Sequence, residues 1–426
     1  MSTTTAALDM GIVQGFAFKV FGDLTAQQMG ALTTVGDRLG LFTTLAESGP
    51  VTSSQFAVQA GVHERYAREW LAAMACHGYL TYEATTAEFE LPREHAFVLA
   101  QPESPLYLGS VFRMSQAYWK HVDLLTEAFK HGGGIPQNEF GEHFWCGFER
   151  FTAASFNNFL VQEWIPAMPS VDAALRLGGT AADVGCGNGQ ALLTLARGYR
   201  NASLVGYDNY GPAIAAATVN ARAAGLDDRV RYELRDVTQG IPATYDLITM
   251  FDVVHDAPHP VQLLSAVAGA LKPDGTCFIL EFNLHGDVQR NIEHPLKLGA
   301  FGYSASLNYC MTQALALGGR RHRHVYGRGA AARGCNGGWL RQDRTSRFPQ
   351  QPVQRFLHAQ HLTTDMEFLH ETFILRHSTE HCCCPAHWLA RDRAGSSRDS
   401  RRRGQLRPTV DKRSHTLERY RGEHTN

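Results

Sequence analysis

The sequence predicts an α/β protein in which a Rossmann-like, doubly wound sheet follows an all-α, winged-helix domain and precedes an irregular C-terminal tail. Three observations support this prediction. Strand-like and helix-like segments alternate between residues 181 and 282. Three helical segments and a hairpin occupy residues 24–91. The charge balance reverses after residue 319, because residues 1–319 hold 19 basic and 31 acidic residues, whereas residues 320–426 hold 21 and 10.

These observations divide the chain into five segments, whose boundaries we predict as follows. They are a leader at residues 1–23, a winged-helix domain at 24–99, a helical linker or lid at 100–170, a ligand-binding α/β domain at 171–319 that lacks its C-terminal strands, and a basic, disordered tail at 320–426.

The predicted winged-helix domain begins with an amphipathic helix at residues 24–45, which ends at Gly49-Pro50. A short capped helix follows and stops at Gly61. The third helix places Tyr66, Trp70, Leu71 and Met74 on one face, and residues 79–91 read as a β-hairpin.

A winged helix either binds DNA or serves as a dimerisation element. DNA binding requires a basic recognition helix, but in the third helix Arg65 and Arg68 are balanced by Glu64 and Glu69. The surrounding body is acidic and repels phosphate. We therefore expect a homodimer formed through this domain and no nucleic-acid partner.

Residues 100–170 are predicted to be helical and are rich in aromatic side chains. Packing between the two domains explains most of these residues, and a second interpretation is that some of them line an apolar substrate pocket. The stretch "HGGGIPQNEFGEHFW", residues 131–145, is the best candidate for a mobile flap.

A glycine-rich turn carries the strongest functional signal. In "ADVGCGNGQ", Asp183, Gly185, Gly187 and Gly189 follow a predicted strand and precede a helix. The glycines let the backbone approach a ligand closely. An acidic residue before the turn repels pyrophosphate and attracts a cationic amino-acid group, which disfavours a dinucleotide.

Further acidic residues end the next strands. Asp208 can accept hydrogen bonds from ribose hydroxyls, Asp236 can accept one from an adenine amino group, and Phe251 beside Asp252 can pack on the adenine. The neighbours Asn209 and Val237 complete the candidate set. Each aspartate alone also suits a helix cap, but their repetition at four successive strand ends favours a binding site.

With these motifs in place, the chain resembles class I S-adenosylmethionine-dependent methyltransferases that carry an N-terminal winged-helix domain, and small-molecule O-methyltransferases in particular. The resemblance covers about residues 24–319 and is most specific in "VQEWIPAMPSVDAALRLGGTAADVGCGNGQ" and "FDVVHDAPHPVQLLSAVAGALKPDGTCFILEFN". It implies S-adenosylmethionine as cofactor, with its methionine end at Asp183 and the glycines, its ribose at Asp208 and its adenine at Asp236.

Methyl transfer requires an aligned acceptor and, for a hydroxyl, removal of a proton. His255 and Asp256 follow the fourth strand, so we predict His255 as a general base oriented by a carboxylate. The alternative is that His255 only packs near the cofactor and that Asp256 caps the next helix. Glu281 and His285 are weaker candidates for acceptor contacts.

The tail has two interpretations. A disordered basic arm would bind nucleic acid. The composition instead suggests a frameshift, because codons compatible with "RRHRHVYG", read one nucleotide later, permit the Gly-rich "GVIGTCMG". Under this hypothesis, which we favour, the last two strands of the sheet are lost and activity is impaired. Sequencing the gene across the Gly319 codon tests it.

The predicted function is methyl transfer to a small aromatic or apolar acceptor, and the alternative is a transcriptional regulator that uses the second domain as a ligand sensor. No metal site is predicted, since Cys382, Cys383 and Cys384 are contiguous and unsuited to tetrahedral zinc. The scattered remaining cysteines, and the lack of an export signal or membrane span, predict a cytoplasmic protein without a membrane partner.

Overall fold

The computed structural model describes residues 7–282, 284, 287–294 and 298–319, together with the backbone of residues 340–342 and 370–377. All of them lie in one compact unit, residues 1–381. No helix among them is long and apolar enough to span a bilayer.

The N-terminal part is helical and contains one hairpin. Its elements are α1 (Met10–Arg38), α2 (Leu41–Ser48), α3 (Ser53–Ala60), α4 (Glu64–Cys76), β1 (Thr81–Glu83), β2 (Glu88–Glu90) and α5 (Arg93–Leu99). Helix α3 begins and ends as predicted. Thr52 and Gln55 form a capping box at its start, and Gly61 ends it with a φ of 64°.

Three details of the helical predictions are wrong. The expected helix at 24–45 is two helices, because Gly40 takes a left-handed conformation between α1 and α2. Helix α1 also begins well before residue 24, since the Asp9 carboxylate accepts from the N–H groups of Gly11 and Ile12. Tyr66 is 78% exposed, because the buried stripe of α4 runs through Ala67 and Trp70.

A second helical group connects the hairpin region to the sheet. It contains α6 (Phe112–Lys120), α7 (Val122–His131), α8 (Gly141–Ser155), a π-helical turn (Phe156–Trp164) and α9 (Pro169–Arg176). The proposed flap at 131–145 is packed at its centre. Ile135 is buried, and its N–H donates to the carbonyl and hydroxyl oxygens of Thr312 at 3.2 and 2.9 Å.

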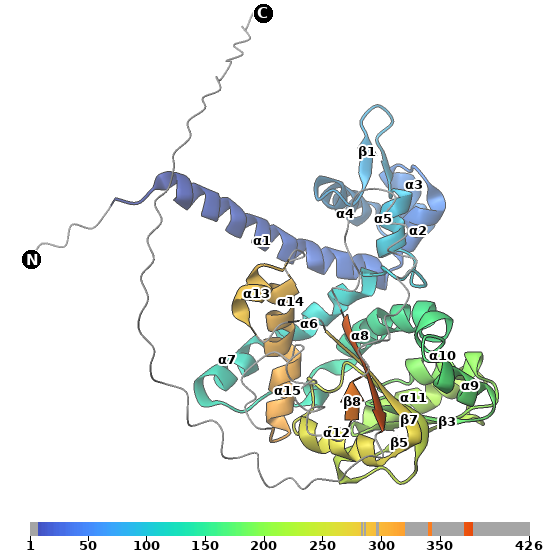
Figure 1. Ribbon diagram of the computed structural model, residues 1–426. Helices are drawn as coiled ribbons and strands as arrows, with labels where there is room; N and C mark the ends of the chain where they lie inside the picture. The colour runs from blue at the N-terminus through green and yellow to red at the C-terminus, as the bar shows by residue number, and fades with distance from the viewer. Residues whose placement is uncertain are drawn as a thin grey trace, which may run out of the picture. The chain divides into compact units, whose positions relative to one another are not determined.

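The α/β region alternates strands and helices as predicted. Its elements are β3 (Thr180–Val184), α10 (Gln190–Gly198), β4 (Ser203–Asp208), α11 (Gly211–Ala223), β5 (Val230–Leu234), β6 (Tyr245–Phe251), α12 (Pro260–Gly269), β7 (Leu271–Phe282), α13 (Val288–Ile292), α14 (Leu298–Ala305), a π-helical turn (Ser306–Cys310) and α15 (Met311–Ala316). Strands β3 to β7 are parallel, and the sheet order is β5-β4-β3-β6-β7-β9-β8 (Figure 1).

The sheet does not end at β7, because two short stretches of the predicted tail add strands to it. Strand β9 (His370–His377) pairs antiparallel with β7 along residues 276–282, and β8 (Leu340–Gln342) pairs antiparallel with β9. The physical reason is local, since "ETFIL" is rich in β-branched and aromatic residues although the tail as a whole is basic. The other residues of the tail, its three adjacent cysteines included, lie outside the described residues.

Candidate functional site

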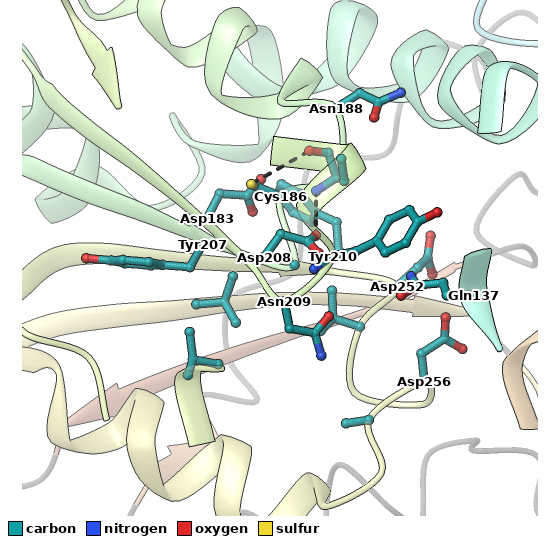
Figure 2. A pocket seen from close by; sticks show the side chains of 18 of the residues that line it. Gln137, Asp183, Cys186, Asn188, Tyr207, Asp208, Asn209, Tyr210, Asp252 and Asp256 are labelled. Carbon is teal, nitrogen blue, oxygen red and sulfur yellow. Dashed lines mark hydrogen bonds between the residues drawn. The ribbon is translucent and has the colours of Figure 1, made fainter. Parts of the chain in front are cut away.

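The carboxyl ends of the parallel strands surround a cavity of about 220 Å³, which we call the acidic cavity. The residues that line it include six carboxylates and a single guanidinium, that of Arg235. The carboxylates are those of Glu149, Asp183, Asp208, Asp236, Asp252 and Asp256. Figure 2 shows side chains of this cavity converging from the ends of β3 and β4 and from the segment after β6.

The glycine turn after β3 is held tightly beneath the cavity. Gly185 has a φ of 73°, and a Cβ there would lie 2.5 Å from a methyl carbon of Val253. Gly189 has a φ of 83°, and a Cβ there would lie 2.3 Å from the Tyr232 hydroxyl. Glycine is therefore required at both positions, for conformation and for space.

Asp183 is 3% exposed at the end of β3 and accepts a hydrogen bond of 2.6 Å from the Thr249 hydroxyl. Burial raises the pKa of Asp183 to about 7, with a contribution from the nearby Asp208 carboxylate, while the bond from Thr249 opposes the shift. Burial thus shifts Asp183 towards the neutral acid, and a cation bound beside it would favour the carboxylate.

Asp208 ends β4 and ties the two turns of the cavity together. Its carboxylate accepts from the Gly187 N–H at 3.0 Å and from the Tyr210 N–H at 2.8 Å (Figure 2). Burial raises the pKa of Asp208, and these backbone donors partly offset that effect. Asn209, which lies between them in the chain, is exposed and lines the cavity.

Asp236 and Val237 follow β5 at the other end of the cavity. Asp236 is exposed and accepts from the N–H and hydroxyl of Thr238, and the hydroxyl bond is the main reason that its pKa is lowered. Val237 is buried and lines the cavity wall. Both predicted residues therefore lie at the cavity, and Asp236 also has the capping role that the sequence left open.

Phe251 and Asp252 end β6. The Phe251 ring contacts those of Phe156 and Phe278 at centroid distances of 4.9 and 5.4 Å, so it lies partly buried at the cavity wall. Asp252 has a φ of 56°, and among the described residues the other non-glycine residue with positive φ is Ala87. Such backbone strain in a buried aspartate is concentrated at functional sites.

His255 lies between two carboxylates, of which the sequence predicted one. Its Nδ1 pairs with Glu281, and its Nε2 lies 3.0 Å from Oδ1 of Asp256. Burial alone lowers the pKa of His255, but the charges of Asp256 and Glu281 outweigh burial and raise this pKa well above its ordinary value. Glu281 is 5% exposed and also accepts from the Val254 N–H at 2.7 Å.

A second cavity, of about 800 Å³, opens on the other side of this cluster, and we call it the apolar cavity. Among the described residues, its lining contains no Asp, Glu, Lys or Arg, and His255 is the one imidazole. The residues that line it include Leu125, Phe129, His255, Ala257, Pro258, Phe282, Phe301, Tyr303, Ser306, Cys310 and Met311. Ala257 and Pro258 line both cavities, so the two are adjacent at this point.

Two groups in the described part of the chain have ligand atoms close enough to hold a metal ion: His255, Asp256 and Cys310, and Asp252, His255 and Glu281. Both depend on His255, whose ring nitrogens already face carboxylates. These ion pairs explain the clusters without an ion. His285, the other weak candidate, lies outside the described residues.

Sequence reasoning missed Glu149 and the orienting role of Glu281. Glu149 lies on α8 within the aromatic segment "FWCGFERF", and Trp145 and Phe148 of that segment also line the acidic cavity. The available signal for Glu149 was that it is a lone acidic residue, spaced along the helix so that it shares a face with the aromatic residues that line the cavity. For Glu281, the available signal was a carboxylate at the end of an otherwise apolar strand.

The residues of the acidic cavity fit a cationic ligand with an adenosyl group. Six carboxylates against one guanidinium favour a ligand that carries a sulfonium and an ammonium, and they disfavour pyrophosphate.

Comparisons with known proteins agree with this chemistry. Residues 27–101 match the family described as "Rv2258c-like winged HTH domain", and residues 177–316 match one described as "Methyltransferase domain". The first match agrees with the predicted winged helix, and the second with the predicted cofactor, S-adenosylmethionine.

Two curated relatives are similar to parts of the chain. The mitomycin biosynthesis 6-O-methyltransferase of Streptomyces lavendulae is 26% identical over 246 residues, which are 56% of this chain and 69% of that protein. The ubiquinone biosynthesis O-methyltransferase of Leptothrix cholodnii is 30% identical over 106 residues, which are 24% of this chain and 43% of that protein.

Solved structures share the fold. The mitomycin 7-O-methyltransferase MmcR superposes with a TM-score of 0.58 at 19% identity, covering 87% of this chain and all of that one. Human N-acetylserotonin methyltransferase, in complex with SAM, gives 0.56 at 15% identity, covering 89% of this chain and all of that one.

Proposed function

We propose that this chain, which joins a winged helix-turn-helix domain to a methyltransferase domain, transfers a methyl group from S-adenosylmethionine to a hydroxyl oxygen of a small aromatic or apolar molecule. The observation that carries the proposal is the pair of adjacent cavities. Carboxylates line one of them, and the described residues that line the other carry no charged side chain apart from His255. When bound, S-adenosylmethionine supplies an electrophilic methyl group on a positively charged sulfur.

In this proposal the acidic cavity holds the cofactor. Asp183 and the glycine turn face its methionine end, Asp208 and Asn209 accept the ribose hydroxyls, and Asp236 with Val237 borders the adenine. Phe251 and Asp252 form the part of the cavity wall between these residues. This assignment is supported by the common cavity that these residues line and by the excess of negative charge.

The apolar cavity holds the acceptor, and His255 is the group that removes its proton. Glu281 fixes Nδ1, which leaves Nε2 to accept the acceptor's proton in place of its ion pair with Asp256. Asp256 and Glu281 then stabilise the resulting imidazolium. Both carboxylates raise the pKa of His255, so the fraction of neutral base grows as pH rises, and activity rises with pH.

The test is to incubate the full chain with methyl-labelled S-adenosylmethionine and a metabolite extract rich in phenols. Label in an organic-soluble product, with stoichiometric S-adenosylhomocysteine, is the expected result. Specific retardation of DNA by a chain that binds no S-adenosylmethionine would overturn the proposal in favour of a regulator. The methyltransferases named above give that alternative no support.

A variant tests the acceptor site separately. Ser306 lines the apolar cavity, so Ser306→Asp places a charge where the acceptor binds. We expect the acceptor KM to rise about tenfold or more, with unchanged binding of S-adenosylhomocysteine.

We propose further that the chain forms a homodimer through its N-terminal domain. The first half of α1 and the residue Leu8 before it expose a set of large apolar side chains that a partner would cover: Leu8, Met10, Ile12, Phe16, Phe18 and Phe21. Light scattering of the wild type and of Phe18→Lys tests this, and a wild type that stays monomeric at micromolar concentration overturns it.

A further inference from the structure

Helix α8 lies against the acidic cavity with a single face. Trp145, Phe148, Glu149 and Thr152 line the cavity at helical spacing, and Phe156 continues the face into the π-helical turn. Glu149 is the one charged residue on that face. A charge is therefore placed in an otherwise apolar or neutral surface that covers the cofactor site.

The Glu149 carboxylate is held by amide groups of the glycine turn. Its Oε2 accepts from Nδ2 of Asn188 at 2.8 Å, and its Oε1 accepts from Nε2 of Gln190 at 2.6 Å. Asn220 adds a longer contact of 3.5 Å. These donors are neutral, and among the described residues no Lys, Arg or His nitrogen lies within 4.0 Å of this carboxylate. Its orientation is fixed while its charge is left without a counter-ion.

The neighbouring carboxylates are less available to a ligand's cation. Asp183 is 3% exposed and accepts a hydrogen bond from Thr249. Each oxygen of Asp208 already accepts from a backbone N–H. Glu149 is half-buried, lines the cavity and is bound only by side-chain amides that border the same turn.

We propose that Glu149 binds the α-ammonium group of the cofactor's methionine moiety. The inference rests on the proposed function and adds a positioning residue to it, supplied by the helical segment and not by the sheet. A charge-assisted hydrogen bond from an ammonium group to a carboxylate already oriented by two amides orders no further side chain on binding.

The back of α8 is anchored to α1, which fixes where Glu149 lies. Arg150, the next residue, donates to the Ser110 hydroxyl at 3.3 Å and lies 3.9 Å from the carboxylate of Asp37. The Asp37 side chain is 4% exposed and also pairs with Arg113. Contacts with the N-terminal helix thus set the position of a cofactor-binding group.

The experiment measures binding of two nucleosides to the full chain by isothermal titration calorimetry. S-adenosylhomocysteine contains the ammonium group, and 5′-methylthioadenosine lacks the whole amino-acid moiety. For Glu149→Gln we expect the Kd of S-adenosylhomocysteine to rise about tenfold and that of methylthioadenosine to stay within about twofold. Glu142→Gln, an exposed change on the same helix, is the matched control and leaves both constants unchanged.

Two outcomes overturn the inference. Equal weakening of both nucleosides assigns Glu149 a purely structural role at the glycine turn, and an unchanged Kd for S-adenosylhomocysteine removes it from binding. A wild-type chain that binds neither nucleoside instead overturns the proposed function. The readout is an affinity, so it does not depend on the identity of the acceptor.

Discussion

The two cavities differ in charge although they share the wall formed by Ala257 and Pro258. Six carboxylates line the acidic cavity, whereas the apolar cavity has no Asp, Glu, Lys or Arg in the part of its lining that the structure describes. The acidic cavity is built from strand ends, and the apolar cavity from helices α7, α14 and α15 with the segments beside them. Recognition of a cation and recognition of an apolar molecule are therefore separated in space, with His255 and Asp256 at the boundary between the two cavities.

The largest effect is expected from a substitution of His255, at the boundary between the two cavities. His255 lines the apolar cavity, so His255→Asn should lower kcat by about 10²–10⁴-fold through loss of the base. The Kd of S-adenosylhomocysteine should change by less than about twofold. Steady-state kinetics with the acceptor found in the extract, together with calorimetry, check both values.

His259→Asn is the matched control for His255, because it is exposed four residues further on. A His255 variant with near wild-type kcat would show that this residue only packs at the boundary, which is the alternative that the sequence left open.

The acidic side is tested by Asp208→Ala. This change removes the acceptor for the N–H groups of Gly187 and Tyr210 and frees both turns. We expect the Kd of S-adenosylhomocysteine to rise about 10- to 100-fold, as for lost hydrogen bonds to a charged group, while the acceptor KM stays nearly constant. Asp228→Ala, in an exposed loop, serves as control. A rise in acceptor KM as large as the rise in Kd would argue against two separate sites.

Much of the difference between the two cavities could be predicted from the sequence, because it depends on residues that are close together in the chain. Strand alternation, the glycine turn and Asp208 each depend on neighbouring residues, and the structure places them together as parallel strands require. Glu281 and Glu149 escaped because their roles arise from tertiary contacts. Glu281 reaches His255 across 26 positions, and Glu149 reaches Asn188 across 39.

The tail shows the opposite limit. Its overall basic composition predicted disorder, yet residues 370–377 pair with β7 because a short β-prone stretch decides strand formation locally. The frameshift hypothesis concerns the gene, and sequencing across the Gly319 codon remains its test.

The pH dependence of kcat/KM tests the role of His255 at the boundary between the two cavities. Removing the charge of Glu281 by Glu281→Gln lowers the pKa of His255, because one of the two carboxylates that raise it is gone. A neutral base is needed, so the acid limb of kcat/KM should move to lower pH. At high pH, kcat should fall about tenfold, since Nδ1 loses its anionic partner.

The exposed Glu293→Gln serves as control for Glu281, and its profile should match the wild type. An acid limb that stays in place in Glu281→Gln would show that the titrating group is not His255.

The smallest effect concerns protons released when the cofactor binds. Burial raises the pKa of Asp183 to about 7. A raised folded-state pKa means that the stability tied to its protonation is present below pH 3.8 and is lost as pH rises through about 7. A cation bound nearby lowers this pKa, so binding of S-adenosylmethionine should release about half a proton at pH 7, approaching one at pH 6 and none at pH 9.

Calorimetry in buffers of different ionisation enthalpy measures this release. Asp183→Asn should abolish it, and methylthioadenosine, which carries no cation, should cause none in the wild type. The described lining of the apolar cavity holds no carboxylate, so acceptor binding in the presence of S-adenosylhomocysteine should be proton-neutral except for His255. If proton release persists in Asp183→Asn, the titrating group is another carboxylate of the acidic cavity. If the wild type releases no proton, the cofactor's cationic end lies away from Asp183.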